Sequence, residues 1–402
     1  MSKRIFITET GVLSCLGMGF NAIADGLKLR PGMSSVKDFE FHQFPTEMPC
    51  FLVKGFDAET VLGKKGLRNK DSATKMLLGA LESGLKTVME SPDERTRPGL
   101  CIGTAFGSVQ SIGDFLSDSI VNGVNNINPQ TFANTVINSP TGNANIRYEA
   151  RNLSATIATA FNAGIDAVIY AYDYMQRGYL DAIAAGGFEE ISYYSLLGLQ
   201  RSSVLSPAGR IRPFAVDSDG CVMGEACALM LLETEEAAGQ RNAKALAEIT
   251  GVSNGFDAKM ANDGKADNET GAYVIQKALR QAGIEKSRID FIASGANGNP
   301  VTDEAEAAAI AGIFGTGTPV TAYKAFTGEC YGASGAMNIL CALSDMKNGT
   351  ISGYNGNGGA RYTTRGSIPL VNETVRKESR NVLVTSFSCE GHCSVIILNT
   401  TL

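Results

Sequence analysis

The stretch that decides the fold is Ser154-Ala155-Thr156-Ile157-Ala158-Thr159-Ala160-Phe161-Asn162-Ala163-Gly164. Its first residues predict an apolar strand, its small residues allow a tight turn, and the apolar run that follows predicts a helix of about four turns. A nucleophile at such a corner gains from the helix dipole and from free backbone amides. The apex is Phe161, whose phenyl ring can neither attack an acyl group nor transfer a proton.

Short β-rich runs alternate with helical patterns on both sides of this corner, which predicts a layered α/β architecture. The strand predictions are Ile5–Ile7, Gly99–Gly103, Asp181–Ala185, Ala226–Leu232, Ala247–Val252, Asp290–Ala293, Pro319–Ala322, Asn381–Thr385 and Ser394–Leu398. The helix predictions are Lys70–Met89, Ala163–Arg177, Gly271–Ala282, Glu304–Ile313 and Gly335–Lys347. The order repeats, so we expect two similar halves, residues 1–240 and 241–402. They would join in a charged helix at Glu233–Lys244 and pack as one unit.

Composition excludes several classes of function. The chain has 402 residues, 44% of them hydrophobic, and a net charge of −6, which disfavours nucleic acid and anionic membranes as partners. No segment approaches the ~20 apolar residues of a membrane helix, and the start lacks a signal-peptide core. Nine scattered cysteines indicate reduced thiols and a cytoplasmic protein. We expect no cofactor. We also expect no metal site, because Cys389, His392 and Cys393 lack further ligands nearby.

Four motifs in order along the chain resemble those of the β-ketoacyl-acyl-carrier-protein synthases. Thr159-Ala160-Phe161-Asn162-Ala163-Gly164 resembles the family's Thr-Ala-Cys-x-x-Gly, and Ala184–Glu189 resembles its Ala-Gly-Gly-x-Glu. The run from Arg212 to Glu225 is similar to Arg-Pro-Phe-Asp…Asp-Gly-Phe-Val-x-Gly-Glu/Asp, and Lys324–Glu329 is similar to Lys-x-x-Thr-Gly-His. The resemblance covers nearly the whole chain. It implies the thiolase fold, in which two similar βαβαβαββ halves stack as α-β-α-β-α layers.

The departures from the family pattern concern the groups that condensation needs. Decarboxylative Claisen condensation uses a thiolate to hold the starter chain and two imidazoles to activate the malonyl thioester. Phe161 replaces the cysteine, Ser294 lies in the loop that replaces Ala-His-Gly-Thr, and Glu329 replaces the second histidine. The family's glycine-rich gate reads Phe387-Ser388-Cys389-Glu390-Gly391-His392-Cys393 here. This pattern indicates a site that no longer performs condensation, so no catalytic residue is expected.

One branch of these synthases resembles the sequence in more detail. Type II polyketide chain length factors lack the cysteine and pair with an intact ketosynthase subunit. The run from Ala293 to Ala307 is similar to their Ala-Asp-Gly-Ala-Gly-x-Pro…Asp-x-Ala-Glu-Ala, and Thr327–Gly332 echoes their Thr-Gly-Arg-Leu-Tyr-Ser. Phe161 departs from the glutamine usual there, so we expect it to fill the old pocket. The resemblance implies a heterodimer in which an acyl carrier protein docks mainly on the catalytic subunit.

A chain length factor forms part of the tunnel that receives the growing chain. Val109, Ile112 and Leu116 fall at i, i+3 and i+7, on one face of the helix predicted after Gly107. Phe132 and Val136 follow on the segment that runs along the dimer interface in this fold. We predict that these five residues line the far end of the tunnel and limit chain length. Ordinary core or interface packing is the alternative for each of them.

Two other interpretations stay open. The chain could be an independent thiolase-fold acyltransferase that uses Cys389 or Cys330 with His392, or a purely structural partner of a synthase. Lys324 is expected to form an ion pair with Glu329 or with Glu306. Asp303 and Glu306 are interpreted as helix-start acids that favour the dipole.

Overall fold

The structure is a computed structural model that describes residues 3–91, 97–150, 152–267, 269–354 and 367–400. Its largest element is a sheet with the strand order β11-β10-β14-β15-β9-β1-β8-β7-β5-β6, and β2 pairs with β1 beside it. The strands from the first half of the sequence are β1 (Ile5–Ser14), β2 (Gly17–Met18), β5 (Gly99–Gly103), β6 (Ser154–Ile157), β7 (Ala182–Glu189) and β8 (Ala226–Thr234). Those from the second half are β9 (Ala247–Phe256), β10 (Phe291–Ala293), β11 (Val320–Thr321), β14 (Asn381–Phe387) and β15 (His392–Asn399).

The two halves repeat one topology. The order β6-β5-β7-β8-β1 and the order β11-β10-β14-β15-β9 use corresponding strands in the same places. In both, the first three strands run parallel and the last two pair antiparallel. The halves join where Phe6 and Ile7 of β1 pair with Glu248 and Ala247 of β9. The predicted fold class is thus confirmed, while the boundary between residues 240 and 241 stays a prediction.

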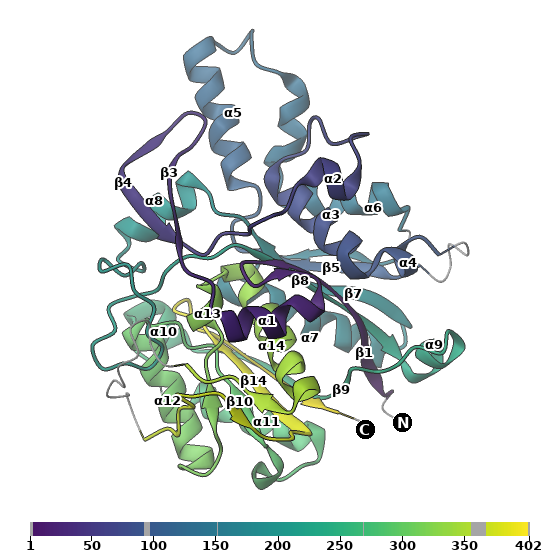
Figure 1. The fold of residues 1–402 in the computed structure, drawn as a ribbon, viewed down its shortest axis with the longest axis vertical. Helices are drawn as coiled ribbons and strands as arrows, with labels where there is room; N and C mark the ends of the chain where they lie inside the picture. Colours follow the sequence, from purple (N-terminus) through teal and green to yellow (C-terminus); the bar gives the residue numbers. More distant parts are fainter. Residues whose placement is uncertain (1–2, 92–96, 151, 268, 355–366, 401–402) are drawn as a thin grey trace.

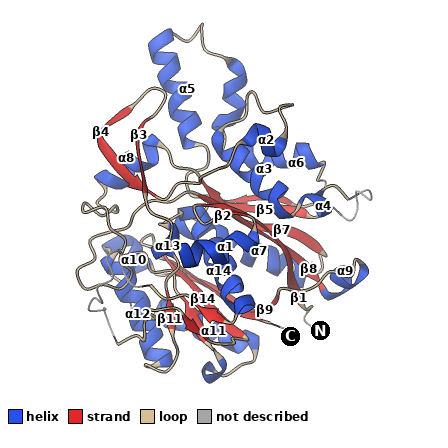
Figure 2. Ribbon diagram, viewed as in Figure 1, coloured by secondary structure: helices blue, strands red, loops and turns tan. Residues whose placement is uncertain are grey.

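Helices lie between and outside the two sheet halves (Figures 1 and 2). The middle layer holds α7 (Ala163–Gln176) and α14 (Ser334–Asn348), which pack against both halves of the sheet, and α1 (Phe20–Leu29), which packs against α14 and β1. One outer layer holds α3 (Ser72–Gly84) and α6 (Ser139–Tyr148). The other holds α11 (Thr270–Ala282) and α12 (Pro300–Phe314). These are the five layers that the resemblance implies.

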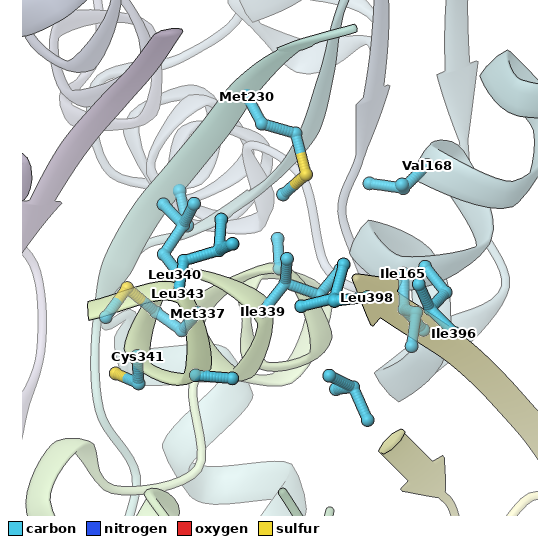
Figure 3. Packing of buried hydrophobic residues seen from close by; sticks show 14 of the residues in the cluster. Ile165, Val168, Met230, Met337, Ile339, Leu340, Cys341, Leu343, Ile396 and Leu398 are labelled. Carbon is cyan, nitrogen blue, oxygen red and sulfur yellow. The ribbon is translucent and has the colours of Figure 1, made fainter. Parts of the chain in front are cut away.

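Helix α14 of the middle layer is buried along most of its length (Figure 3). Every residue of α14 from Ser334 to Met346 is buried, as expected for a helix covered on all sides. Met337 and Leu340 of α14 pack in one cluster with Val168 of α7, Met230 of β8 and Leu398 of β15. Burial of such side chains stabilises the fold by about 1.5–3 kcal/mol each.

Not every predicted helix has the expected extent. The helix expected at Lys70–Met89 is divided at Leu85 into α3 (Ser72–Gly84) and α4 (Lys86–Met89). The charged helix expected at Glu233–Lys244 is only α9 (Glu235–Gln240). Glu233 instead belongs to strand β8, where its buried carboxylate accepts from Arg241 Nε at 2.7 Å. Thr234 then caps α9 by accepting from the backbone N–H of Ala237.

An arm of the first half projects from the body in Figure 1. It is formed by α5 (Val109–Asn122) and the 3₁₀ helix η1 (Pro129–Thr135), which pack together. Near it lie α8 (Tyr193–Arg201) and the hairpin of β3 (Ser34–Asp38) and β4 (Gln43–Cys50). The remaining elements are α2 (Ala58–Leu62), α4 (Lys86–Met89), η2 (Ala160–Asn162), α10 (Ala258–Asp263), η3 (Lys286–Arg288), α13 (Lys324–Thr327), η4 (Tyr331–Ala333), β12 (Thr350–Ile351) and β13 (Val375–Arg376). No helix of the described residues is long and apolar enough to cross a membrane.

Candidate functional site

The corner between β6 and α7 keeps the geometry of a nucleophile elbow. Ala160 has a φ of 48°, in the left-handed region that residues with a Cβ rarely adopt. Thr159 Oγ1 donates to Asp166 Oδ2 at 2.6 Å, and Asn162 Nδ2 donates to the carbonyl of Ser386 at 2.8 Å. These bonds hold the corner from both sides. The strained turn therefore presents the apex side chain at the N-terminal end of α7.

Phe161 at the apex is buried in an aromatic cluster. Its side chain is 8% exposed, and its ring meets the ring of Tyr331 edge to face at 4.3 Å between centroids. Phe106 lies against both rings, at 6.4 Å from Phe161 and 5.4 Å from Tyr331. Leu196 and Met223 belong to the same cluster. Phe161, the predicted apex residue, therefore places a phenyl ring at the position where a nucleophile would lie.

Glu329 lies at the centre of a closed polar network. Its Oε2 accepts from Lys324 Nζ and from Asn297 Nδ2, both at 2.7 Å. Its Oε1 accepts from the backbone N–H of Tyr331 at 2.9 Å and from the hydroxyl of Ser334. The ion pair expected between Lys324 and Glu329 is confirmed.

The Lys324–Glu329 pair is buried, with 3% and 1% of the two side chains exposed. Burial acts to lower the pKa of Lys324, but the carboxylates of Glu329 and Glu306 outweigh it, so this pKa is raised. Lys324 therefore stays charged beside Glu329. With both oxygens of Glu329 occupied by donors, this carboxylate holds the surrounding loops in place.

Ser294 lies in a loop that two buried acids hold. Glu306 Oε1 accepts from Ser294 Oγ at 2.8 Å, from the backbone N–H of Gly295 at 2.9 Å and from the hydroxyl of Thr385. Asp303 accepts from the backbone N–H groups of Phe214 at 2.7 Å and of Asn297 and Gly298 at 3.0 Å each.

Asp303 lies in the first turn of α12, as predicted, but the interpretation of the two acids as groups that only favour the helix dipole is incomplete. Both are buried on the inner side of α12, and they tie its first turns to the loops of Ser294 and Phe214. Burial raises the pKa of Asp303 to about 7 and also raises that of Glu306. These two residues shape the site through its loops.

The alternative interpretation relies on the thiols of Cys389, in the loop between β14 and β15, and of Cys330, which directly precedes η4. Burial raises the pKa of the Cys389 thiol to about 12 and that of Cys330 well above its usual range. A protonated thiol is a poor nucleophile. The ring of His392 packs edge to face on Phe256, with centroids 5.1 Å apart. Among the described residues, no cluster of three or more His, Cys, Asp or Glu could hold a metal ion.

The structure brings the five predicted tunnel residues together on the arm. Val109, Ile112 and Leu116 lie on α5, Phe132 lies on η1, and Val136 follows directly after it. Val109 is partly buried, whereas the other four are 36–59% exposed. The same segment of the chain carries further exposed apolar side chains. We define the apolar arm as Ile112, Leu116, Ile120, Val121, Val124, Phe132, Val136 and Ile137.

Several residues of the site were not singled out from the sequence. Asn297 and Ser334 complete the network of Glu329, and Phe106 and Tyr331 enclose Phe161. Tyr331 adopts a φ of 43° that no sequence pattern indicates. Asn297 could have been chosen from the sequence as a site residue, because it is a polar side chain in the loop that replaces the family's first histidine.

Comparison with known proteins places the chain in one family. The model of the β-ketoacyl synthase N-terminal domain matches residues 34–238, and that of the C-terminal domain matches residues 246–354. A 3-oxoacyl-[acyl-carrier-protein] synthase 2 of Coxiella burnetii is 30% identical over 366 residues, which cover 87% of each chain.

Solved structures agree with this placement. The ishigamide ketosynthase/chain length factor superposes with a TM-score of 0.91 at 24% identity over the whole of both chains. A ketosynthase in complex with its chain length factor from Xenorhabdus doucetiae superposes with a TM-score of 0.85 at 22% identity, over 99% of this chain and 98% of that one. At these identities the likeness shows the fold. Together with the sequence matches, these findings show that the chain belongs to the β-ketoacyl synthase family.

Proposed function

We propose that this chain is a chain length factor, a subunit that performs no condensation itself and pairs with a catalytic ketosynthase subunit of a type II polyketide synthase. In that complex it forms part of the tunnel for the growing poly-β-ketoacyl chain and limits its length. The observation that carries the proposal is the composition of the old catalytic centre. Phe161 takes the nucleophile position, and Glu329 is saturated by four donors.

The chemistry of the centre supports the first part of the proposal. Condensation develops negative charge on an enolate, which donors or positive charge stabilise and a carboxylate opposes. Glu329 carries the wrong charge for that role, and the buried cation Lys324 is already paired with it. Phe161 supplies no pair of electrons for attack on a thioester.

The surface of the arm supports a protein partner. Large contiguous apolar surfaces on a folded chain mark interaction sites. Ile120, Val121 and Val124 of the apolar arm are 71–82% exposed in the isolated chain. Strand β6, which precedes Phe161, is at the end of the sheet order, so one of its edges has no strand beside it among the described residues. An intact ketosynthase subunit of the same fold is the partner that we propose for this surface.

In the proposed heterodimer, the acyl carrier protein that delivers substrate would dock on the catalytic subunit. Acyl carrier proteins are acidic, and this chain itself has a net charge of −6. Like charges disfavour docking, so the carrier protein would bind mainly to the catalytic subunit. The two solved structures described above are named as ketosynthases with chain length factors, which supports the proposed pairing of subunits.

Shortening two tunnel side chains is expected to lengthen the product. In complexes that carry Val109→Ala or Phe132→Ala, the distribution of chain lengths should shift upwards by at least one two-carbon unit, because the tunnel loses bulk at its far end. Mass spectrometry of the released products measures the shift. Leu29→Ala is the matched control, since Leu29 is 81% exposed on α1 outside the apolar arm. Unchanged lengths from folded, dimeric variants would instead support a purely structural partner.

Restoring the cysteine alone is expected to leave the chain inactive. A Phe161→Cys variant regains a thiol at the elbow, but the site still has Ser294 and Glu329 where the family has histidines. Loss of general acid–base groups typically costs a factor of 10²–10⁴ each. The purified variant should show no condensation above the wild-type background when malonyl and acyl carrier proteins are supplied. Turnover by Phe161→Cys at a rate typical of a synthase would contradict the interpretation of the centre.

A further inference from the structure

A cluster of polar and aromatic side chains ties the arm to the body of the molecule. Helix α5 packs against η1 within the arm and against α8, which follows β7 after a short loop. Helix α8 is anchored in the body, because its Leu196 and Leu199 pack in the same buried cluster as Phe161. The position of α5 therefore depends on how this helix is attached to α8.

Gly113 allows α5 to approach α8 closely. It is the buried residue of α5, and a Cβ atom there would lie 1.8 Å from Cε2 and 2.0 Å from Cζ of the Tyr194 ring. An ordinary contact between two carbon atoms is about 3.5–4.0 Å long. The ring of Tyr194 thus lies directly on the backbone of α5, and a side chain at position 113 would have to displace one of the two.

A hydrogen-bonded triangle holds the Tyr194 ring in this position. Its hydroxyl group lies 2.8 Å from His42 Nε2 and 3.2 Å from Oγ of Ser117, which is one turn along α5 from Gly113. His42 Nε2 also lies 3.1 Å from Ser117 Oγ. The triangle joins α5 and α8 to the turn of the β3–β4 hairpin, which lies beside α5 in Figure 1. We define the clamp as His42, Gly113, Ser117 and Tyr194.

Aromatic stacking fixes the third corner of the triangle, His42. Its ring stacks on that of Tyr193, with centroids 4.6 Å apart and an angle of 16° between the planes. Tyr193 also packs against Phe39 and Phe44, on either side of His42 in the sequence. The backbone N–H of Tyr193 donates to Gln110 Oε1 of α5 at 2.8 Å. The hairpin and α8 therefore hold α5 as one rigid unit.

The clamp lies beside the predicted tunnel residues on the same helix. Ile112 and Leu116 precede Gly113 and Ser117 by one position each, and one residue turns an α-helix by about 100°. The two sets of residues therefore form adjacent strips along α5. In the proposed heterodimer the tunnel lies between the arm and the partner, so a movement of α5 away from α8 would narrow the tunnel.

We propose that Tyr194, held by His42, is a positioning residue for chain length: it fixes how far α5 lies from the body, and the position of α5 sets where the tunnel ends. This inference rests on the proposed function, because only a chain in the tunnel would respond to the position of α5. The clamp residues need no contact with that chain. They act through the tunnel residues of α5.

Gly113→Ala tests the steric part of the inference. Alanine favours a helix over glycine, so the change does not weaken α5 itself. The new methyl group should push α5 away from the Tyr194 ring and shorten the main product of the complex by at least one two-carbon unit, as measured by mass spectrometry. The matched control is Gly312→Ala in α12, where no atom of the described chain beyond its own helix lies within 4 Å of the new methyl group. It should leave the length unchanged.

A second substitution removes the obstacle. In the double variant Gly113→Ala with Tyr194→Ala, the ring that the methyl group meets is absent, so α5 can return to its position. The main product should then regain its wild-type length. A general defect of α5 would not be corrected by a second truncation. If the product of the double variant stays as short as that of Gly113→Ala, the methyl group does not act through Tyr194 and the inference is wrong.

Two milder variants test the hydrogen bonds and decide the question if Gly113→Ala fails to fold. Tyr194→Phe keeps the ring and loses the hydroxyl group, and His42→Phe keeps the stacking on Tyr193 and loses Nε2. Each should raise the share of products other than the main one about threefold, as expected for the loss of one ordinary hydrogen bond. The two changes together should do no more than either alone, because both break the same triangle. Tyr273→Phe, 56% exposed on α11, should leave the distribution unchanged.

The inference and the proposed function fail in different ways. If no ketosynthase subunit binds this chain, or if Val109→Ala leaves the product lengths unchanged, the proposed function is wrong and the inference falls with it. If Val109→Ala changes the lengths while folded, dimeric clamp variants keep the wild-type distribution, the inference is wrong and the proposed function stands.

Discussion

Glu329→Ala is expected to lower the free energy of unfolding by about 3–5 kcal/mol, because it leaves the Lys324 ammonium buried without its partner. The Lys324 side chain is 3% exposed, so water cannot replace the lost carboxylate. Asn297, Ser334 and the backbone N–H of Tyr331 lose their acceptor at the same time. Chemical denaturation at neutral pH, followed by circular dichroism, measures the change.

Two variants test whether the missing charge causes this loss. Glu329→Gln keeps an acceptor oxygen of nearly the same shape and should cost less than the alanine variant. The double variant Lys324→Met with Glu329→Leu removes both charges, and it should recover a large part of the stability. A Glu329→Ala protein within 1 kcal/mol of the wild type would show that the network does not hold the site together.

Leu116→Asp should weaken binding of the ketosynthase subunit by at least about 100-fold. The side chain is 55% exposed in the middle of α5, so the isolated chain should tolerate the change. In the complex, the new carboxylate would be buried against apolar surface without a partner, at a cost of several kcal/mol. Titration of the labelled variant with the purified ketosynthase subunit gives the dissociation constant.

The matched control for this prediction is Leu29→Asp. Leu29 is 81% exposed at the end of α1, away from the apolar arm, and the same change there should not alter the dissociation constant. Circular dichroism of both variants separates loss of binding from loss of fold. Undiminished binding by Leu116→Asp would show that the partner does not cover the apolar arm.

Local patterns were sufficient to predict much of the fold. Gly99–Gly103 was predicted to the residue, since an apolar run between glycine-bearing turns has few other solutions. The corner at Phe161 was predicted because a strand pattern changes to a helical one within a few residues. The Lys324–Glu329 pair is one of the two that were expected for Lys324, the other being with Glu306.

The features that were missed depend on contacts between distant segments. In the sequence, Glu306 looks like any acid near the start of a helix. Its structural role depends on a hydrogen bond from Thr385, which is 79 residues away. The β3–β4 hairpin has no strong alternation of polar and apolar residues, so its sequence carried little strand signal. Glu190 follows Glu189 at the end of a strand, and nothing in the sequence indicates that one of its oxygens is buried without a partner.

The central claim is that this chain assists condensation without carrying the acyl group. The most direct test incubates the chain and its ketosynthase subunit, separately and together, with acyl-loaded carrier protein, followed by mass spectrometry of the intact proteins. We predict an acyl adduct on the ketosynthase subunit, no adduct on this chain under any condition, and product formation only when both are present. A thioester adduct on a cysteine of this chain, or product from this chain alone, would contradict the account.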